Sequence, residues 1–224
     1  MVTHMQSPST AIIDKPASVE SALESIGLSK RKILDIASAA CFARAEYLPN
    51  IDPVNYPGVR AYQEGTRQIR LATLPDGWKN SKFNNIELVL NTKLGLMLGF
   101  QNVDIACSSK DPQAISARGE ATKQLVSLPY QKSLFSDDPP KMEGSPEGAF
   151  PVVWFICVAA FDDRLQVEVS RPKPFDGDQF SGFYERIFVA DEALELEYRS
   201  EDESVDEGGE EPEVIVTKKN NGPA

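Results

Sequence analysis

Carboxylates on predicted strands are the side chains of this sequence best suited to chemistry. Asp104 and Glu168 each lie within a predicted strand, and Asp163 lies at the turn that precedes the strand of Glu168. Two or three converging carboxylates bind Mg²⁺, because this hard cation prefers oxygen ligands, and a nearby lysine offsets the charge that develops during phosphodiester cleavage. These three residues are the candidate catalytic residues of a metal-dependent nuclease or phosphodiesterase.

The spacing around Glu168 argues against that function. Ser170 stands two residues after Glu168, where the D/E-x-K element of such enzymes carries a lysine. The apolar residues of the run 165–169 alternate with Glu168, and in a sheet covered on one face this alternation turns Glu168 toward solvent. We therefore expect an exposed Glu168, no metal site and no cofactor. Mg²⁺ is implied only under the enzyme alternative.

Residues for other common catalytic systems are scarce. The single histidine, His4, lies in a start that resembles a cloning remnant, so histidine-based catalysis and histidine-ligated metals are not expected. Cys41, Cys107 and Cys157 are far apart and set among apolar residues, which favours buried free thiols in a reducing compartment. The phosphate-binding patterns G-x-x-x-x-G-K-[ST] and G-x-G-x-x-G do not occur.

Basic and aromatic residues are interspersed between residues 60 and 83, a combination that suits contact with phosphates and stacking on bases. A mildly basic stretch also follows residue 109. The candidate binding residues are Arg67, Arg70, Trp78, Lys79, Arg118 and Lys123. Alternatively, Trp78 packs under the turn at residues 74–78 and the charges are ordinary surface. Nucleic-acid binding is thus an alternative that is not favoured, and the acidic C-terminal end is another candidate occupant of this basic surface.

The negative charge of the chain is concentrated at its C-terminal end. The formal net charge is −11, and residues 181–224 carry four Lys/Arg against thirteen Asp/Glu, a net charge of −9. Broad attraction to nucleic acid or to anionic membranes is therefore not expected. The longest apolar run, Ala149–Phe161, has thirteen residues, whereas a membrane span needs about 20. We expect a soluble cytoplasmic protein without a signal peptide.

Apolar periodicity predicts helices first and strands afterwards. Ser29 is the expected N-cap of the second helix, and Gly65 weakens the third. From residue 86 the period changes from 3.6 to 2, which predicts an antiparallel three-strand meander with a turn at Gln101-Asn102. The predicted helices cover residues 18–27, 30–48, 59–71 and 114–126, and the predicted strands cover 86–91, 94–100, 103–107, 152–161, 165–171, 183–189 and 193–198.

These patterns predict an α+β fold, with N-terminal helices packed on a largely antiparallel or mixed β-sheet and an acidic disordered C-terminal segment. The favoured function is a non-enzymatic regulatory or protein-interaction module whose partner is another protein. The predicted parts are a loose N-terminus 1–16, one domain 17–199 and an acidic flexible tail 200–224. Within the domain we expect a helical part 17–73 and a sheet part 84–199 with a long loop 109–149.

Overall fold

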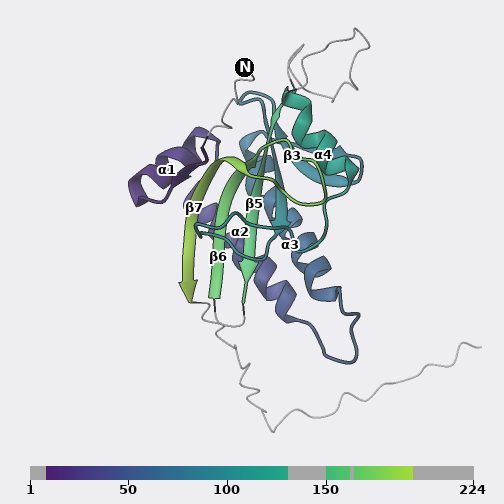
Figure 1. The fold of residues 1–224 in the computed structure, drawn as a ribbon. Coiled ribbons are helices and arrows are strands. Elements are labelled where there is room, and N and C mark those ends of the chain that lie inside the picture. The colour runs from purple at the N-terminus through teal and green to yellow at the C-terminus, as the bar shows by residue number, and fades with distance from the viewer. Residues whose placement is uncertain (1–8, 131–149, 162–163, 194–224) are drawn as a thin grey trace, which may run out of the picture.

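A computed structural model describes residues 9–130, 150–161 and 164–193. In these residues four α-helices accompany one seven-stranded sheet (Figure 1), so the predicted α+β class is confirmed. The acidic segment 200–224 and most of the predicted strand 193–198 lie outside the described residues.

The first three helices form where apolar periodicity predicted them. They are α1 (Pro16–Ser25), α2 (Lys30–Ala45) and α3 (Tyr56–Thr73). The Ser29 hydroxyl accepts a hydrogen bond from the Lys32 backbone nitrogen at 3.4 Å and caps α2 as expected. A short 3₁₀ turn, η1 (Leu74–Asp76), ends α3, and Gly77 follows it with a φ of 84°.

Gly65 is a packing residue within α3. A Cβ atom built at this position would lie 2.3 Å from Cδ2 of Phe100, far inside van der Waals contact. The missing side chain therefore lets the Phe100 ring contact the helix backbone directly. The glycine that weakened the helix prediction is what allows α3 to lie against the sheet.

The sheet is mixed, and its strands follow the order β1-β7-β6-β5-β4-β3-β2. The β4–β5 and β1–β7 pairs are parallel and the other neighbours are antiparallel. The strand predicted over residues 152–161 is the central one, as its two apolar faces indicated. The strands are β1 (Ala11–Ile13), β2 (Lys79–Phe83), β3 (Ile86–Asn91), β4 (Leu96–Asn102), β5 (Val152–Ala160), β6 (Arg164–Pro172) and β7 (Phe183–Ala193).

Two strand predictions were wrong. Gln101-Asn102 is the end of β4 rather than a turn, and residues 103–107 leave the sheet apart from a bridge between Val103 and Ala114. The meander instead begins at β2, an edge strand of sequence KNSKF that has no apolar alternation to reveal it. Its hairpin turn is Asn84-Asn85, whose φ angles of 43° and 69° suit asparagine.

The predicted loose N-terminus 1–16 was also wrong for its last third. Ala11–Ile13 pair with β7 as the edge strand β1, and the Thr10 hydroxyl donates to the Phe183 carbonyl at 2.9 Å. β1 therefore forms one edge of the sheet, where it runs parallel to the first half of β7. Residues 1–8 lie outside the described residues.

Both faces of the sheet are covered. Helices α1, α2 and α3 bury one face, where Leu98, Ile156 and Val167 are fully enclosed. The other face is covered by the loop 103–119, by α4 (Glu120–Ser127) with the 3₁₀ turn η2 (Leu128–Tyr130), and by the loop 173–182. Figure 1 shows α2 behind the strands and the loop that follows β4 crossing in front of them. Among the described residues, no helix combines the length and apolar character needed to cross a membrane.

Candidate functional site

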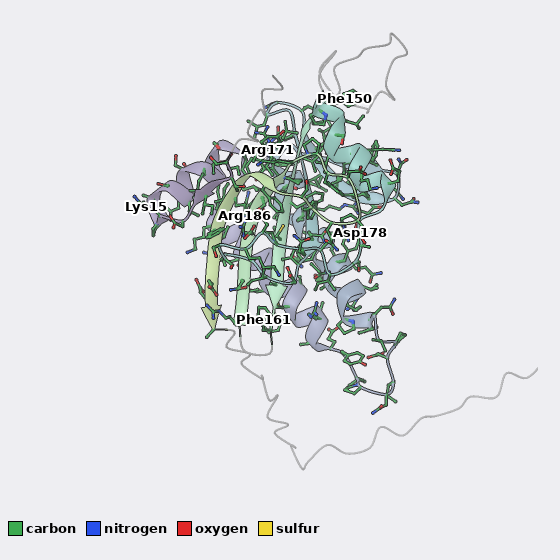
Figure 2. All side chains as sticks on the ribbon, viewed as in Figure 1. Lys15, Phe150, Phe161, Arg171, Asp178 and Arg186 are labelled. Carbon is green, nitrogen blue, oxygen red and sulfur yellow. The ribbon has the colours of Figure 1, made fainter. Side chains whose placement is uncertain are left out.

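Glu168 lies at the centre of a buried ion pair. Its side chain and that of Arg186 on β7 both have 0% exposure. Arg186 Nε donates to Glu168 Oε1 at 2.8 Å and Nη2 donates to Oε2 at 2.7 Å. Arg186 Nη1 also reaches Asp111 Oδ1 at 3.2 Å. Figure 2 shows Arg186 midway along the sheet, between Arg171 and Phe161 toward its two ends.

The expectation that Glu168 faces solvent was wrong. Alternation does turn Glu168 away from the helices, but the loop 103–119 covers that face of β6 as well. Neighbouring Gln166 and Ser170, also polar, are 7% and 0% exposed. The strand face that the sequence assigned to solvent is therefore a second, partly polar core.

The Glu168 carboxylate is saturated with hydrogen-bond donors. Besides the two bonds from Arg186, Ser170 Oγ donates to Oε1 at 2.7 Å and the Cys107 backbone nitrogen donates to Oε2 at 2.8 Å. A carboxylate offers about four lone-pair directions, so these four bonds fill them. Glu168 cannot bind a metal ion or accept a proton from a substrate without losing one of these contacts.

Arg186 is held in its charged form. Burial on its own lowers the pKa of this guanidinium, but the hydrogen bonds to Glu168 and the charges of Glu168 and Asp111 outweigh burial and raise it above its ordinary value. The rings of Phe183 and Phe188 lie 5.9 and 5.0 Å from the guanidinium carbon. The arrangement is a closed, charge-balanced contact between β6, β7 and the loop 103–119, which is a structural role.

Cys107 belongs to the same contact and is not an activated thiol. Its backbone has a φ of 51°, and its sulfur lies 3.1 Å from the Val167 carbonyl and 3.2 Å from the Ala190 carbonyl. Burial, reinforced by the negative charge of Glu168, raises the pKa of Cys107 to about 12. Because the thiolate is the nucleophile, this environment suppresses reactivity.

Asp104, a second predicted catalytic residue, is engaged in contacts of its own. Asp104 pairs with exposed Lys110 at 3.1 Å and accepts from the Gln113 backbone nitrogen at 2.7 Å, so it fastens the start of the loop 103–119. Asp163 lies outside the described residues. No group of three or more His, Cys, Asp or Glu side chains in the described part of the chain is arranged to hold a metal ion.

Two of the predicted binding residues, Arg67 and Arg70, line one open groove on the helical side of the molecule. This surface, called the α3 groove below, has a volume of about 460 Å³. Arg67 pairs with Glu64 at 2.9 Å and Arg70 pairs with Glu87 on β3 at 2.5 Å. The groove is lined by Tyr62, Gln63, Thr66, Arg67, Arg70, Leu71, Leu74 and Glu87.

The remaining predicted binding residues lie elsewhere. Trp78 is 4% exposed and packs in the helical-side core, so it is not available to stack on a base. Lys79 is exposed on the edge strand β2. Arg118 donates to Gln101 at 2.6 Å on the other face of the sheet, where burial lowers its pKa, and Lys123 of α4 pairs with Glu120 at 3.5 Å. The six residues therefore do not form one basic surface.

The connection between α2 and α3 exposes large apolar side chains that the sequence analysis did not select. It extends past the lower ends of β5 and β6 in Figure 1. We call this cluster the α2–α3 tip. Its members and their exposed fractions are Phe42 (53%), Leu48 (58%), Ile51 (78%), Val54 (91%) and Val59 (43%).

The α2–α3 tip is held by its own hydrogen bonds. The Asp52 carboxylate accepts from the Leu48 backbone nitrogen at 2.8 Å, and the Asp52 nitrogen donates back to the Leu48 carbonyl at 3.0 Å. Asn50 takes a left-handed conformation, with a φ of 68°. Arg60 of α3 pairs with Glu46 at the end of α2 at 2.9 Å. The turn is thus fixed while its apolar side chains remain in water.

A sequence signal for this tip was present. Residues 50–58 lie between the predicted helices 30–48 and 59–71, and their Asn and Pro residues are typical of a turn-rich connection that nevertheless contains Ile51 and Val54. An isoleucine and a valine in a short connection have no core to enter, because a connection of this kind runs over the surface. Large apolar residues in a short surface connection are therefore the sequence signal that indicates the α2–α3 tip.

Comparison of the chain with protein-family models, with curated proteins and with solved structures returned no match. The geometry of the described residues therefore carries the functional argument alone.

Proposed function

We propose that this protein is a non-enzymatic protein-interaction module that docks a partner protein through the α2–α3 tip. The observation that carries the proposal is the exposure of Ile51 and Val54, at 78% and 91%, on a turn that is already ordered. Large apolar side chains gathered on a surface favour burial against another protein. A pre-ordered turn also loses little conformational entropy on binding.

The buried network supports this proposal over the enzyme alternative. Glu168, the strongest catalytic candidate, accepts four hydrogen bonds from other residues of the fold, which leaves its carboxylate no free acceptor position. Arg67 and Arg70 are each paired with a carboxylate, which reduces the positive charge available to nucleic-acid phosphates. The free cysteines Cys41, Cys107 and Cys157 support a reducing compartment, and we place the protein in the cytoplasm.

The experiment compares partner capture by the full chain and by an Ile51→Ser/Val54→Ser variant. The serine variant should lose partner proteins that the original chain retains, while its melting temperature stays the same because neither side chain packs in the core. The matched control is Ile115→Ser, at a side chain that is 53% exposed on the other face of the sheet. Equal capture by all three chains would contradict the proposed docking surface.

A second measurement addresses the enzyme alternative. The purified chain with Mg²⁺ should not hydrolyse DNA, RNA or a cyclic nucleotide. Turnover that disappears in Asp104→Asn would overturn the non-enzymatic assignment. Asp104 is the suitable position for this test because its side chain is partly exposed, whereas substitution of Glu168 would disturb the core.

A further inference from the structure

One wall of the α3 groove is a row of polar side chains on α3. Tyr62, Thr66 and Arg70 follow one another at intervals of four residues, so they form one row along α3. Thr66 is 8% exposed, and its Oγ1 atom is buried without a hydrogen-bond partner in the described residues. The Nε atom of Arg70 is also buried and has no hydrogen-bond partner in the described residues. This wall of the groove is therefore polar, while these two atoms themselves are enclosed.

The groove combines these donors with an apolar side. Leu71 and Leu74 line it and are 56% and 36% exposed. α2 lies on the side of α3 toward β5, β6 and β7, whereas on the side toward β2 no helix of the described residues packs against α3. On β3 the groove is bordered by Glu87, which Arg70 and Lys82 bind from two sides. A suitable occupant therefore carries carboxylates next to apolar side chains.

We propose that the C-terminal segment Glu210–Thr217 of the same chain, EEPEVIVT, docks in the α3 groove. Its glutamates supply negative charge opposite Arg67, whose side chain is 64% exposed even though it also contacts Glu64. Its run Val214–Val216 supplies apolar side chains for Leu71 and Leu74. The negative charge of the segment is complementary to that of Arg67, the more exposed of the two paired groove arginines.

The chain is long enough for this contact. Residues 194–209 separate the end of β7 from the segment and can span up to about 50 Å. The groove beside β3 lies four strands from β7, which is about 19 Å across the sheet. Docking in cis also benefits from an effective concentration that a separate peptide lacks. The inference concerns a different surface from the α2–α3 tip and does not depend on it.

The experiment places the photo-cross-linking residue benzoylphenylalanine at position 71 of the full chain. Irradiation should give an intramolecular cross-link to residues 210–217, identified by mass spectrometry of the digested monomer. The same residue at position 74 is the second probe and applies if the first variant does not fold. A probe at position 115, on the other face of the sheet, is the control and should give no such product.

Charge reversal then tests the chemistry of recognition. Arg67→Glu should lower the yield of the cross-link about fivefold, because a surface charge contributes modestly to such a contact. Arg31→Glu is the matched control, since Arg31 lies on α2 with a side chain 92% exposed, and it should leave the yield unchanged. Cross-links between two chains, cross-links only to other segments, a yield equal to that of the probe at 115, or equal yields in the two charge variants would overturn the proposal.

Discussion

At the scale of single residues, the ion pair between Glu168 and Arg186 makes the core on the second face of the sheet partly polar. Two opposite charges are withdrawn from water completely, and every acceptor position of the carboxylate is used. Desolvation of such a pair is costly, so its presence adds less stability than its geometry suggests. Removal of one partner strongly destabilises the fold, because the other charge stays buried with too little opposite charge beside it.

We predict that Glu168→Gln lowers the free energy of unfolding by about 3–5 kcal/mol, because the buried Arg186 then keeps only the partly exposed Asp111 as a counter-charge. The double variant Glu168→Leu/Arg186→Met should recover most of this loss. Urea denaturation at neutral pH measures both. The control is the exposed pair Arg164–Asp191, whose bonds are also bidentate and whose coupling in a double-mutant cycle should not exceed about 1 kcal/mol. A loss below about 1 kcal/mol for Glu168→Gln would contradict the structural role.

The burial of Glu168 could have been inferred from its neighbour in the sheet. Residues 152–161 are apolar on both faces, which predicted a strand covered on both sides. The adjacent strand β6 then has to be covered on both sides as well, at least next to β5. Arg186, an arginine in the middle of the apolar run FYERIFV, supplies the opposite charge. The position of the loop 103–119 has no such signal, because its polar sequence does not state which strand it crosses.

At the scale of elements, α3 is used on two sides. One side lies against β4 through Gly65 and the Phe100 ring, and the other forms the α3 groove. The position of the groove therefore depends on how closely the helix backbone approaches the sheet. A side chain at residue 65 would act as a spacer between the two elements.

We predict that Gly65→Ala destabilises the fold by about 1–3 kcal/mol, although alanine favours a helix, because the added methyl group overlaps the Phe100 ring. Gly58→Ala is the matched control. It lies in the same helix, a Cβ there would meet nothing within 4 Å, and the substitution should be neutral or stabilising by up to about 1 kcal/mol. Thermal unfolding of the two variants distinguishes them. Equal melting temperatures would show that the close approach at residue 65 is not needed.

The elements that periodicity predicted well are those with one continuous apolar stripe or two apolar faces, such as α2 and β5. Periodicity failed at β2, which lies at the edge and buries none of its five residues completely. It failed again at residues 103–107, where Val103 and Ala106 are buried but by a loop rather than by a strand. The apolar pattern of a sequence reflects which residues are buried. A loop that covers a sheet can therefore show the same alternation of apolar and polar residues as a strand.

At the scale of the whole molecule, six of the seven strands form two antiparallel meanders, and β1 adds a parallel edge beside β7. β2, β3 and β4 form one, β5, β6 and β7 form the other, and the parallel pair β4–β5 joins them. Helix α3 covers the first meander, while α1 and α2 cover the second. The chain passes from one meander to the other through residues 103–151, and the described part of this connection, residues 103–130, packs on the sheet to form the second core together with the loop 173–182.

This joint has a consequence for the order of folding. Within each meander the strands are close in sequence, but Leu96 of β4 pairs with Val152 of β5, so their contact requires closure of a long loop. We expect the meanders to form first and the central pair to form at the rate-limiting step. Doubling the length of the whole connection 103–151, with a Gly/Ser insert of about 49 residues placed within residues 131–149, should then slow refolding about threefold, since each doubling of a loop costs about 0.6 kcal/mol.

Stopped-flow refolding and unfolding measure this effect. The unfolding rate should stay unchanged, and the same insert after Ala224 should leave both rates unchanged. An identical refolding rate for the two inserted chains would mean that β4 and β5 meet only after the barrier. The central strand β5 is then completed late on its β4 side. Until that step its apolar face and its unpaired edge stay open to wrong pairing, so the centre of the finished sheet is where misfolding of the chain is most to be expected.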